Sequence, residues 1–160
     1  MGDVYTMTNK EENLLHTIAF SMLEGVSEKQ KLIMLRHYGS ATNIYHLYKK
    51  NNSLWPTHEA EDEINFITKH NIDCFAYLDN DYPNRLNNIS DPPLALYTKG
   101  STQFNLPQLI SIVGTRQHTY QVNKVIQELL EGLQHLKMGV ISGLALGVDG
   151  IAHASALQYQ

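Results

Sequence analysis

Two short glycine-containing segments near the carboxyl end of the chain carry the residues best suited to bind an anion. Glycine lets the backbone turn sharply and lets an anion approach the amide groups without a Cβ in the way. Thr115 offers a hydroxyl donor, and Arg116 offers a planar guanidinium that matches the oxygens of a phosphate. We therefore expect both segments to form one phosphate site. Its predicted residues are Gly114, Thr115 and Arg116 in the first segment and Ser142, Gly143, Leu144 and Gly147 in the second.

Two titratable residues, Asp149 and His153, come directly after the second segment and are spaced by one helical turn. Capping is the simpler explanation of an aspartate at the start of a helix. A structural hydrogen bond is the simpler explanation of one histidine on an otherwise apolar helix. We expect both residues to support the pocket rather than to catalyse a reaction. The other histidines lack the spacing or cysteine partners of a zinc site, so we predict no metal and no cofactor.

The elements around the two glycine segments predict parallel βαβ units. Apolar runs at 109–113 and 138–142 precede the segments, and helical periodicity follows at 122–136 and 148–157. In such sheets, ligands bind beyond the carboxyl ends of the strands, where loops lead into helices. The continuous apolar run at 109–113 also predicts a strand covered by helices on both faces. No Gly-x-Gly-x-x-Gly pattern occurs, which disfavours an ordinary NAD enzyme.

The first half of the chain has a helical pattern. Residues 11–48 predict three short helices, with Ser27 as an N-cap, Gln30 in the reciprocal capping position and Gly39 as a C-cap. A fourth amphipathic helix is predicted at 59–70. The arrangement resembles a helix-hairpin-helix or SAM-like module. An acidic residue beside its first turn favours a packing or protein-contact role over a DNA clamp.

The pattern changes near residue 71. Beyond it, β-prone segments at 72–77 and 94–98 flank a stretch of turn residues. We therefore predict an α/β chain with a helical domain at 1–70 and a Rossmann-like domain at 71–160. We expect the latter to hold only the first part of a larger parallel sheet, so that the chain is truncated.

The composition limits how the chain could bind nucleic acid. Its 160 residues carry a formal net charge of −4, so it does not coat a polyanion by bulk charge and any contact must be local. The single cysteine, Cys74, suits a reducing, cytoplasmic location. No apolar run reaches the length of a membrane span and no signal peptide is evident, so we expect a soluble protein.

The order of the motifs is similar to that of the DprA/Smf family. The matching segments are LISIVGTR at 109–116 and VISGLALGVDGIAH at 140–153, with Tyr82-Pro83 and Asp91-Pro92-Pro93 upstream. The resemblance implies a protein that binds single-stranded DNA entering a competent cell and helps to load RecA recombinase on it during natural transformation. It also implies that the 114–116 loop grips a backbone phosphate, beside a wall formed by the second glycine segment. A homodimer is implied for a full-length protein and stays open for this chain.

The same residues would also suit two other functions. A nucleotide-binding enzyme of the lysine-decarboxylase-like or nucleotide-hydrolase group would use the same glycine loops to hold phosphates. Only Asp149 and His153 are placed to act as its general acid or base. A protein-interaction module would instead act through the N-terminal helices.

Overall fold

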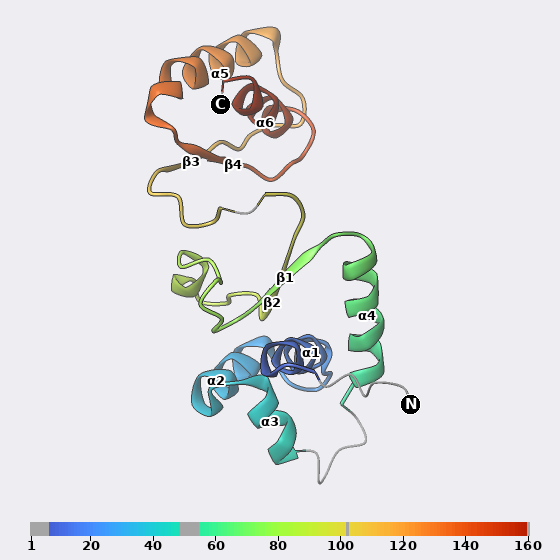
Figure 1. The fold of residues 1–160 in the computed structure, drawn as a ribbon. Helices are drawn as coiled ribbons and strands as arrows, with labels where there is room; N and C mark the ends of the chain where they lie inside the picture. The colour runs from blue at the N-terminus through green and yellow to red at the C-terminus, as the bar shows by residue number, and fades with distance from the viewer. Residues whose placement is uncertain (1–6, 49–54, 102, 160) are drawn as a thin grey trace. The chain divides into compact units, whose positions relative to one another are not determined.

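The computed structural model describes residues 7–48, 55–101 and 103–159 (Figure 1). The chain divides into two compact units, Met1–Phe104 and Asn105–Gln160, called here the first and second unit. This division lies beyond the boundary expected near residue 71. The physical reason is that Tyr77, Tyr82 and Leu94, which follow residue 71, are buried in the same core as the helices.

The first unit begins with four helices. They are α1 (Asn9–Met22), α2 (Glu28–Tyr38), α3 (Ala41–Tyr48) and α4 (Thr57–Lys69). The predicted capping of α2 is confirmed, because Ser27 and Gln30 form a reciprocal capping box. Gly39 ends the same helix in the left-handed conformation with φ of 80°, as a glycine C-cap should.

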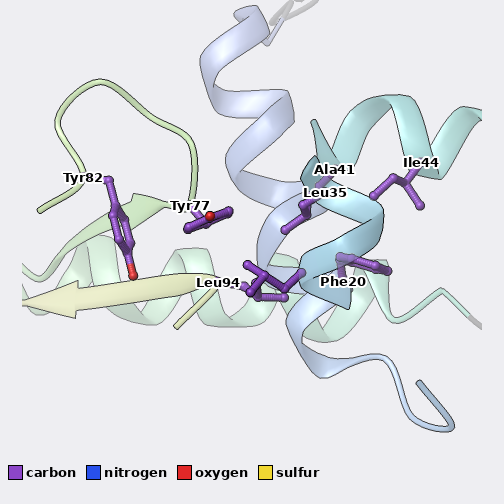
Figure 2. Packing of buried hydrophobic residues seen from close by; sticks show 8 residues of the cluster. Phe20, Leu35, Ala41, Ile44, Tyr77, Tyr82 and Leu94 are labelled. Carbon is purple, nitrogen blue, oxygen red and sulfur yellow. The ribbon is translucent and has the colours of Figure 1, made fainter. Parts of the chain in front are cut away.

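An antiparallel pair of strands completes the first unit. Strands β1 (Asp73–Ala76) and β2 (Ala95–Thr98) pair with Asp73 opposite Thr98, and a short 3₁₀ helix, η1 (Leu86–Asn88), lies in the connection between them. Figure 2 shows side chains from the helices and from this connection meeting in one core. The Tyr82 ring is fully buried there, and its hydroxyl donates a hydrogen bond to the Pro93 carbonyl oxygen at 2.8 Å. Burial raises the pKa of Tyr82 to about 12, and the neighbouring Tyr77 adds to the shift.

The second unit has the predicted order of strand, helix, strand and helix. Strand β3 (Leu109–Ser111) leads through a loop to α5 (Tyr120–Leu133) and the 3₁₀ turn η2 (Gln134–Leu136). Strand β4 (Gly139–Ile141) then pairs parallel to β3, with Ile110 opposite Val140, and is followed by α6 (Val148–Gln158). The parallel pair confirms the βαβ prediction, although both strands are shorter than the apolar runs that predicted them.

The prediction that helices cover both faces of this sheet is wrong for the described residues. Ile112 and Val140 pack against the cluster formed by α5 and α6, so both helices lie over the same face (Figure 1). Side chains alternate along a strand, so Ile141 points to the opposite face, where 49% of its surface is exposed. The neighbouring Val113 is 69% exposed. Within the second unit, one face of the β3–β4 pair therefore carries no helix.

Candidate nucleic-acid interface

The loop after β3 carries the predicted Gly114-Thr115-Arg116 segment. A Cβ at Gly114 would lie 2.9 Å from the Val148 side chain, so a larger residue would displace the start of α6. The Thr115 hydroxyl oxygen accepts a hydrogen bond from the Gln117 amide at 3.1 Å. An oxygen that accepts in this way keeps its own hydrogen, so Thr115 is still able to donate to an anion.

Arg116 is exposed on the same loop. Among the residues that the structure describes, no carboxylate forms an ion pair with its guanidinium. An exposed guanidinium without an internal counter-charge presents its donors to solvent and to any approaching phosphate.

The loop after β4 forms the other side of the candidate site. The Ser142 hydroxyl donates a hydrogen bond of 2.5 Å to the Ile112 carbonyl oxygen, so its proton is directed into the sheet. Leu144 has a left-handed backbone with φ of 53°, and 78% of its surface is exposed. Leu146 is 82% exposed. The loop therefore presents two aliphatic side chains to solvent, while its serine ties the loop to β3.

Gly147 brings the two loops into contact. Its φ is 89°, and a Cβ at this position would overlap the carbonyl oxygens of Thr115 and Arg116. The next amide, that of Val148, donates a hydrogen bond to the Thr115 oxygen at 3.1 Å. Only glycine fits at 147, both because of its backbone conformation and because of this close approach.

Asp149 links the two loops through its carboxylate, and 6% of the residue's surface is exposed. Its Oδ1 accepts a hydrogen bond from the Gly114 amide at 3.2 Å, and its Oδ2 accepts one from the Gly143 amide at 3.0 Å. The expectation that Asp149 caps α6 is wrong. The N-cap is Gly147, which makes no side-chain cap hydrogen bond, and Asp149 lies inside the first turn. Because Asp149 occupies these two glycine amides, an anion has to be held by other groups of the loops and by Arg116.

His153 lies one turn beyond Asp149 on α6 and is only partly exposed. Its Nε2 atom is buried, and within the described residues it has no hydrogen-bond partner. The structure therefore brings His153 close to the site along the helix without showing a contact to either glycine loop.

The formal charge is divided unevenly between the two units. The first unit contains nine basic and 13 acidic residues, a difference of −4. The second unit contains three of each, so its net charge is zero: the basic residues are Arg116, Lys124 and Lys137, and the acidic residues are Glu128, Glu131 and Asp149. Of these acids, Asp149 is buried and Glu128 lies 3.6 Å from Lys124. The candidate site thus lies on the unit that repels a polyanion least.

An open hollow of about 510 Å³ lies next to the second glycine loop, between α5 and α6. Its lining includes His118, Asn123, Gln127, Leu144 and Leu146. Of these, only Leu144 was predicted as a site residue from the sequence. A signal for two others was present, because Asn123 and Gln127 are spaced by one helical turn on the helix that follows the Gly-Thr-Arg loop.

Neither a metal centre nor a membrane span is found in the described part of the chain. No group of three or more potential metal-ligating side chains comes together there. No described helix combines the length and apolar character needed to cross a bilayer.

Comparison with known proteins gives consistent matches. The family model of DNA recombination-mediator protein A matches residues 73–160. The DNA processing protein DprA of Streptococcus pneumoniae is 36% identical over 84 residues, which are 52% of this chain and 29% of that protein. DprA of Bacillus subtilis is 37% identical over 78 residues, covering 48% of this chain and 26% of that protein. The protein Smf of Escherichia coli is 34% identical over 77 residues, covering 48% and 21%.

A solved structure extends the likeness beyond the family match. The X-ray structure of DNA processing protein A from Streptococcus pneumoniae aligns with 97% of this chain at a TM-score of 0.62 and 26% sequence identity. The chain spans 56% of that structure's chain. The mixed helical and parallel-sheet architecture predicted from the sequence is thereby confirmed.

Proposed function

The chain belongs to the family of DNA recombination-mediator protein A, and on that premise we propose that it binds single-stranded DNA through the Gly114–Arg116 loop. The supporting relatives are named as DNA-processing proteins. This role requires a protein group that binds the phosphate of the DNA backbone whatever base is attached. Arg116 meets this requirement, because a guanidinium forms paired, charge-assisted hydrogen bonds with phosphate oxygens.

The observation that carries the proposal is the exposed Arg116 on a loop held in a fixed conformation. Asp149 fastens Gly114 and Gly143 to each other through one carboxylate, and Gly147 packs directly against the backbone at Arg116. A loop that is ordered before binding loses less conformational entropy when the ligand arrives. The two loops therefore suit a preformed anion site at the carboxyl edge of β3 and β4.

Binding without catalysis is the role that the site chemistry supports. Both carboxylate oxygens of Asp149 already accept hydrogen bonds from backbone amides, so this residue is not aimed at a reacting group. His153 has its Nε2 buried. No specific observation favours the nucleotide-enzyme alternative, whose test is turnover of a nucleoside monophosphate that is lost on replacing His153.

The wider role is an extension of this proposal. We infer that the chain acts in the cytoplasm on DNA taken up by the cell, that it promotes RecA loading, and that a full-length protein forms a homodimer. The helical module at 1–70 is proposed to contact proteins rather than DNA. The Rossmann-like second unit is proposed to carry the DNA-binding site.

The test is a titration of labelled single-stranded oligonucleotide at several salt concentrations, followed by fluorescence anisotropy. For single strands, log affinity falls against log salt by about 0.7 per phosphate neutralised. Replacing Arg116 with Ala should lower the affinity about tenfold, because a charge-assisted hydrogen bond contributes about 1.5 kcal/mol or more. The salt slope should fall by about 0.7.

Lys124→Ala is the matched control, since it removes one positive charge from the same unit at an exposed position on α5. An unchanged affinity and slope in Arg116→Ala would contradict the proposal. So would equal losses in both variants, because these would indicate only a response to net charge.

A further inference from the structure

Helix α4 of the first unit presents an acidic outer face that also carries an aromatic ring. The helix holds four carboxylates and one lysine, a formal charge of −3. Ala60 and Ile67 are its buried residues, so the opposite side of the helix is turned outward. Glu59, Asp62 and Phe66 are exposed on that side at spacings of three and four residues. Phe66 exposes 52% of its surface there, which is unusual for a phenyl ring without a binding partner.

Helix α2 presents an outer face of the opposite charge. It holds three basic residues and one acidic residue, a formal charge of +2. Lys31 is buried and pairs with Glu28 at 2.8 Å, so these two charges offset each other. The outer face is formed by Lys29, Ile33 and Arg36, which are exposed at spacings of four and three residues. Ile33 exposes 56% of its surface between the two basic side chains.

The charged groups of both faces are free to take a new partner. The Arg36 Nε donates a hydrogen bond to the Tyr77 hydroxyl at 3.0 Å, which positions the guanidinium and leaves its other N–H donors for a carboxylate. Asp62 lies 3.3 Å from His58, but both side chains are largely exposed. Exposed pairs of this kind contribute little, so the Asp62 carboxylate can exchange its partner at small cost.

The two faces do not meet within the first unit. Both helices pack against α1, and the described residues of α2 and α4 make no contact with each other. Figure 1 shows the two helices on opposite sides of α1. Each face therefore lacks its complement within the unit, whereas a second copy of the chain presents that complement.

We propose that first units associate head to tail, with the α4 face of one copy on the α2 face of the next. Phe66 packs against Ile33 and supplies the apolar contact, and the Asp62 carboxylate meets Lys29 and Arg36 around it. Because two different faces meet, the contact repeats without closing, unlike a two-fold dimer in which one face meets itself. The inference does not depend on the proposed DNA site, which lies in the second unit.

Sedimentation velocity of the full chain over a range of concentrations measures the association. The weight-average sedimentation coefficient of the wild type should rise past that of a dimer, because an open contact does not stop at two copies. Lys29→Glu and Asp62→Lys should each weaken the association at least about tenfold, since each places like charges opposite one another. The double variant should restore it, because the signs are then exchanged on both faces.

Two variants control for net charge. Lys99→Glu and Asp91→Lys make the same changes of charge at exposed positions of the first unit outside α2 and α4. Both should keep the wild-type association. Circular dichroism and Trp55 fluorescence check that every variant is folded, as expected for substitutions at exposed side chains.

A mixing experiment separates the head-to-tail contact from a symmetric one. Ile33→Asp damages the α2 face and keeps the α4 face, whereas Phe66→Asp does the reverse. Neither variant should associate alone. Their mixture should form a one-to-one complex that grows no further, because it contains a single pair of intact faces.

Four outcomes would overturn the proposal. The first is a wild-type chain that stays monomeric up to about 1 mM, where even weak contacts form. The second is association that neither Lys29→Glu nor Asp62→Lys reduces, since it would belong to another surface. The third is an equal loss in the Lys99 and Asp91 controls, which would indicate a response to net charge alone. The fourth is a double variant that stays as weak as the single ones.

Discussion

Each of the two compact units is stabilised internally in a different way. The largest fully buried side chains among the described residues all lie in the first unit: Tyr82, Phe20, Ile18, Leu35, Ile44 and Thr17. The second unit has a small core around Ile126 and Leu130 and leaves Val113, Leu144 and Leu146 exposed. Its loop edge is fixed instead by hydrogen bonds to one carboxylate and by contacts that only glycine permits. Packing of large side chains therefore dominates in one unit, and polar backbone contacts shape the other.

The largest expected loss of stability follows from a substitution in the core of the first unit. Phe20→Ala removes a fully buried ring that stacks on Trp55 with ring centroids 5.4 Å apart. Such a truncation lowers the free energy of unfolding by about 4 kcal/mol, because it loses apolar contact and leaves a cavity. Trp55 is the only tryptophan of the chain, so its fluorescence during urea unfolding measures this unit.

A matched exposed position provides the control for the packing of the first unit. Phe66→Ala on α4 truncates the same type of side chain where 52% of its surface is exposed. It should lower the free energy of unfolding clearly less than Phe20→Ala does. Comparable losses in the two variants would contradict the view that burial of large side chains stabilises the first unit.

The next effect tests the polar contacts of the second unit. Asp149→Asn keeps the size of the side chain but replaces one acceptor with an NH₂ group, which cannot accept from the second amide. Leaving a buried donor unpaired costs about 2 kcal/mol. Hydrogen exchange of the Gly114 and Gly143 amides should accelerate, and oligonucleotide affinity should fall through loss of loop order.

The same Asp149→Asn variant should leave the tryptophan-monitored unfolding of the first unit unchanged. A shift of that transition would show that the two units depend on each other for stability. Retained exchange protection at both glycine amides would contradict the role assigned to the carboxylate.

A further effect, which develops only at alkaline pH, is a loss of first-unit stability. Burial raises the pKa of Cys74 from its ordinary value of 9.0 to about 12, with further contributions from Glu63 and Asp79. Burial also raises the pKa of Tyr82, from 10.0 to about 12, and that of Tyr97. A folded-state pKa above the unfolded value means that the unfolded chain releases its proton first as pH rises. The contribution of these groups to the free energy of unfolding is therefore fully present below about pH 9. It decreases as the pH rises towards about 12.

Tryptophan-monitored urea unfolding at increasing alkaline pH measures this decline. Tyr82→Phe removes one of the titrating groups, so its stability should fall less steeply with pH, although it also loses the hydrogen bond to Pro93. A decline as steep as that of the wild type would show that Tyr82 does not titrate with the predicted shift.

Local signals were sufficient to predict most elements. The caps of α2, the periodicity of α1 to α4, and the alternation of strands and helices after residue 105 depend on neighbours within a few positions. The division between Phe104 and Asn105 depends instead on Tyr77 and Tyr82 packing among helices far away in sequence. No local pattern contains that information.

The candidate site, too, was only partly predictable from local sequence patterns. Its glycine loops were identifiable because strand ends followed by glycines indicate where ligands approach a parallel sheet. The bridging role of Asp149 was missed, since its bond to Gly114 spans 35 residues and capping explained the same residue locally. The residues of the hollow on α5 were missed because asparagine and glutamine are also ordinary on a helix surface.

The contact at Gly147 has a mechanical consequence. The Val148 amide is bonded to Thr115, and Gly147 leaves no gap beside the backbone of Arg116. A displacement of the arginine loop must therefore carry the beginning of α6 with it. If the proposed DNA binding displaces that loop, a spin label on a cysteine introduced at Leu157, which is 77% exposed near the far end of the helix, would report the movement.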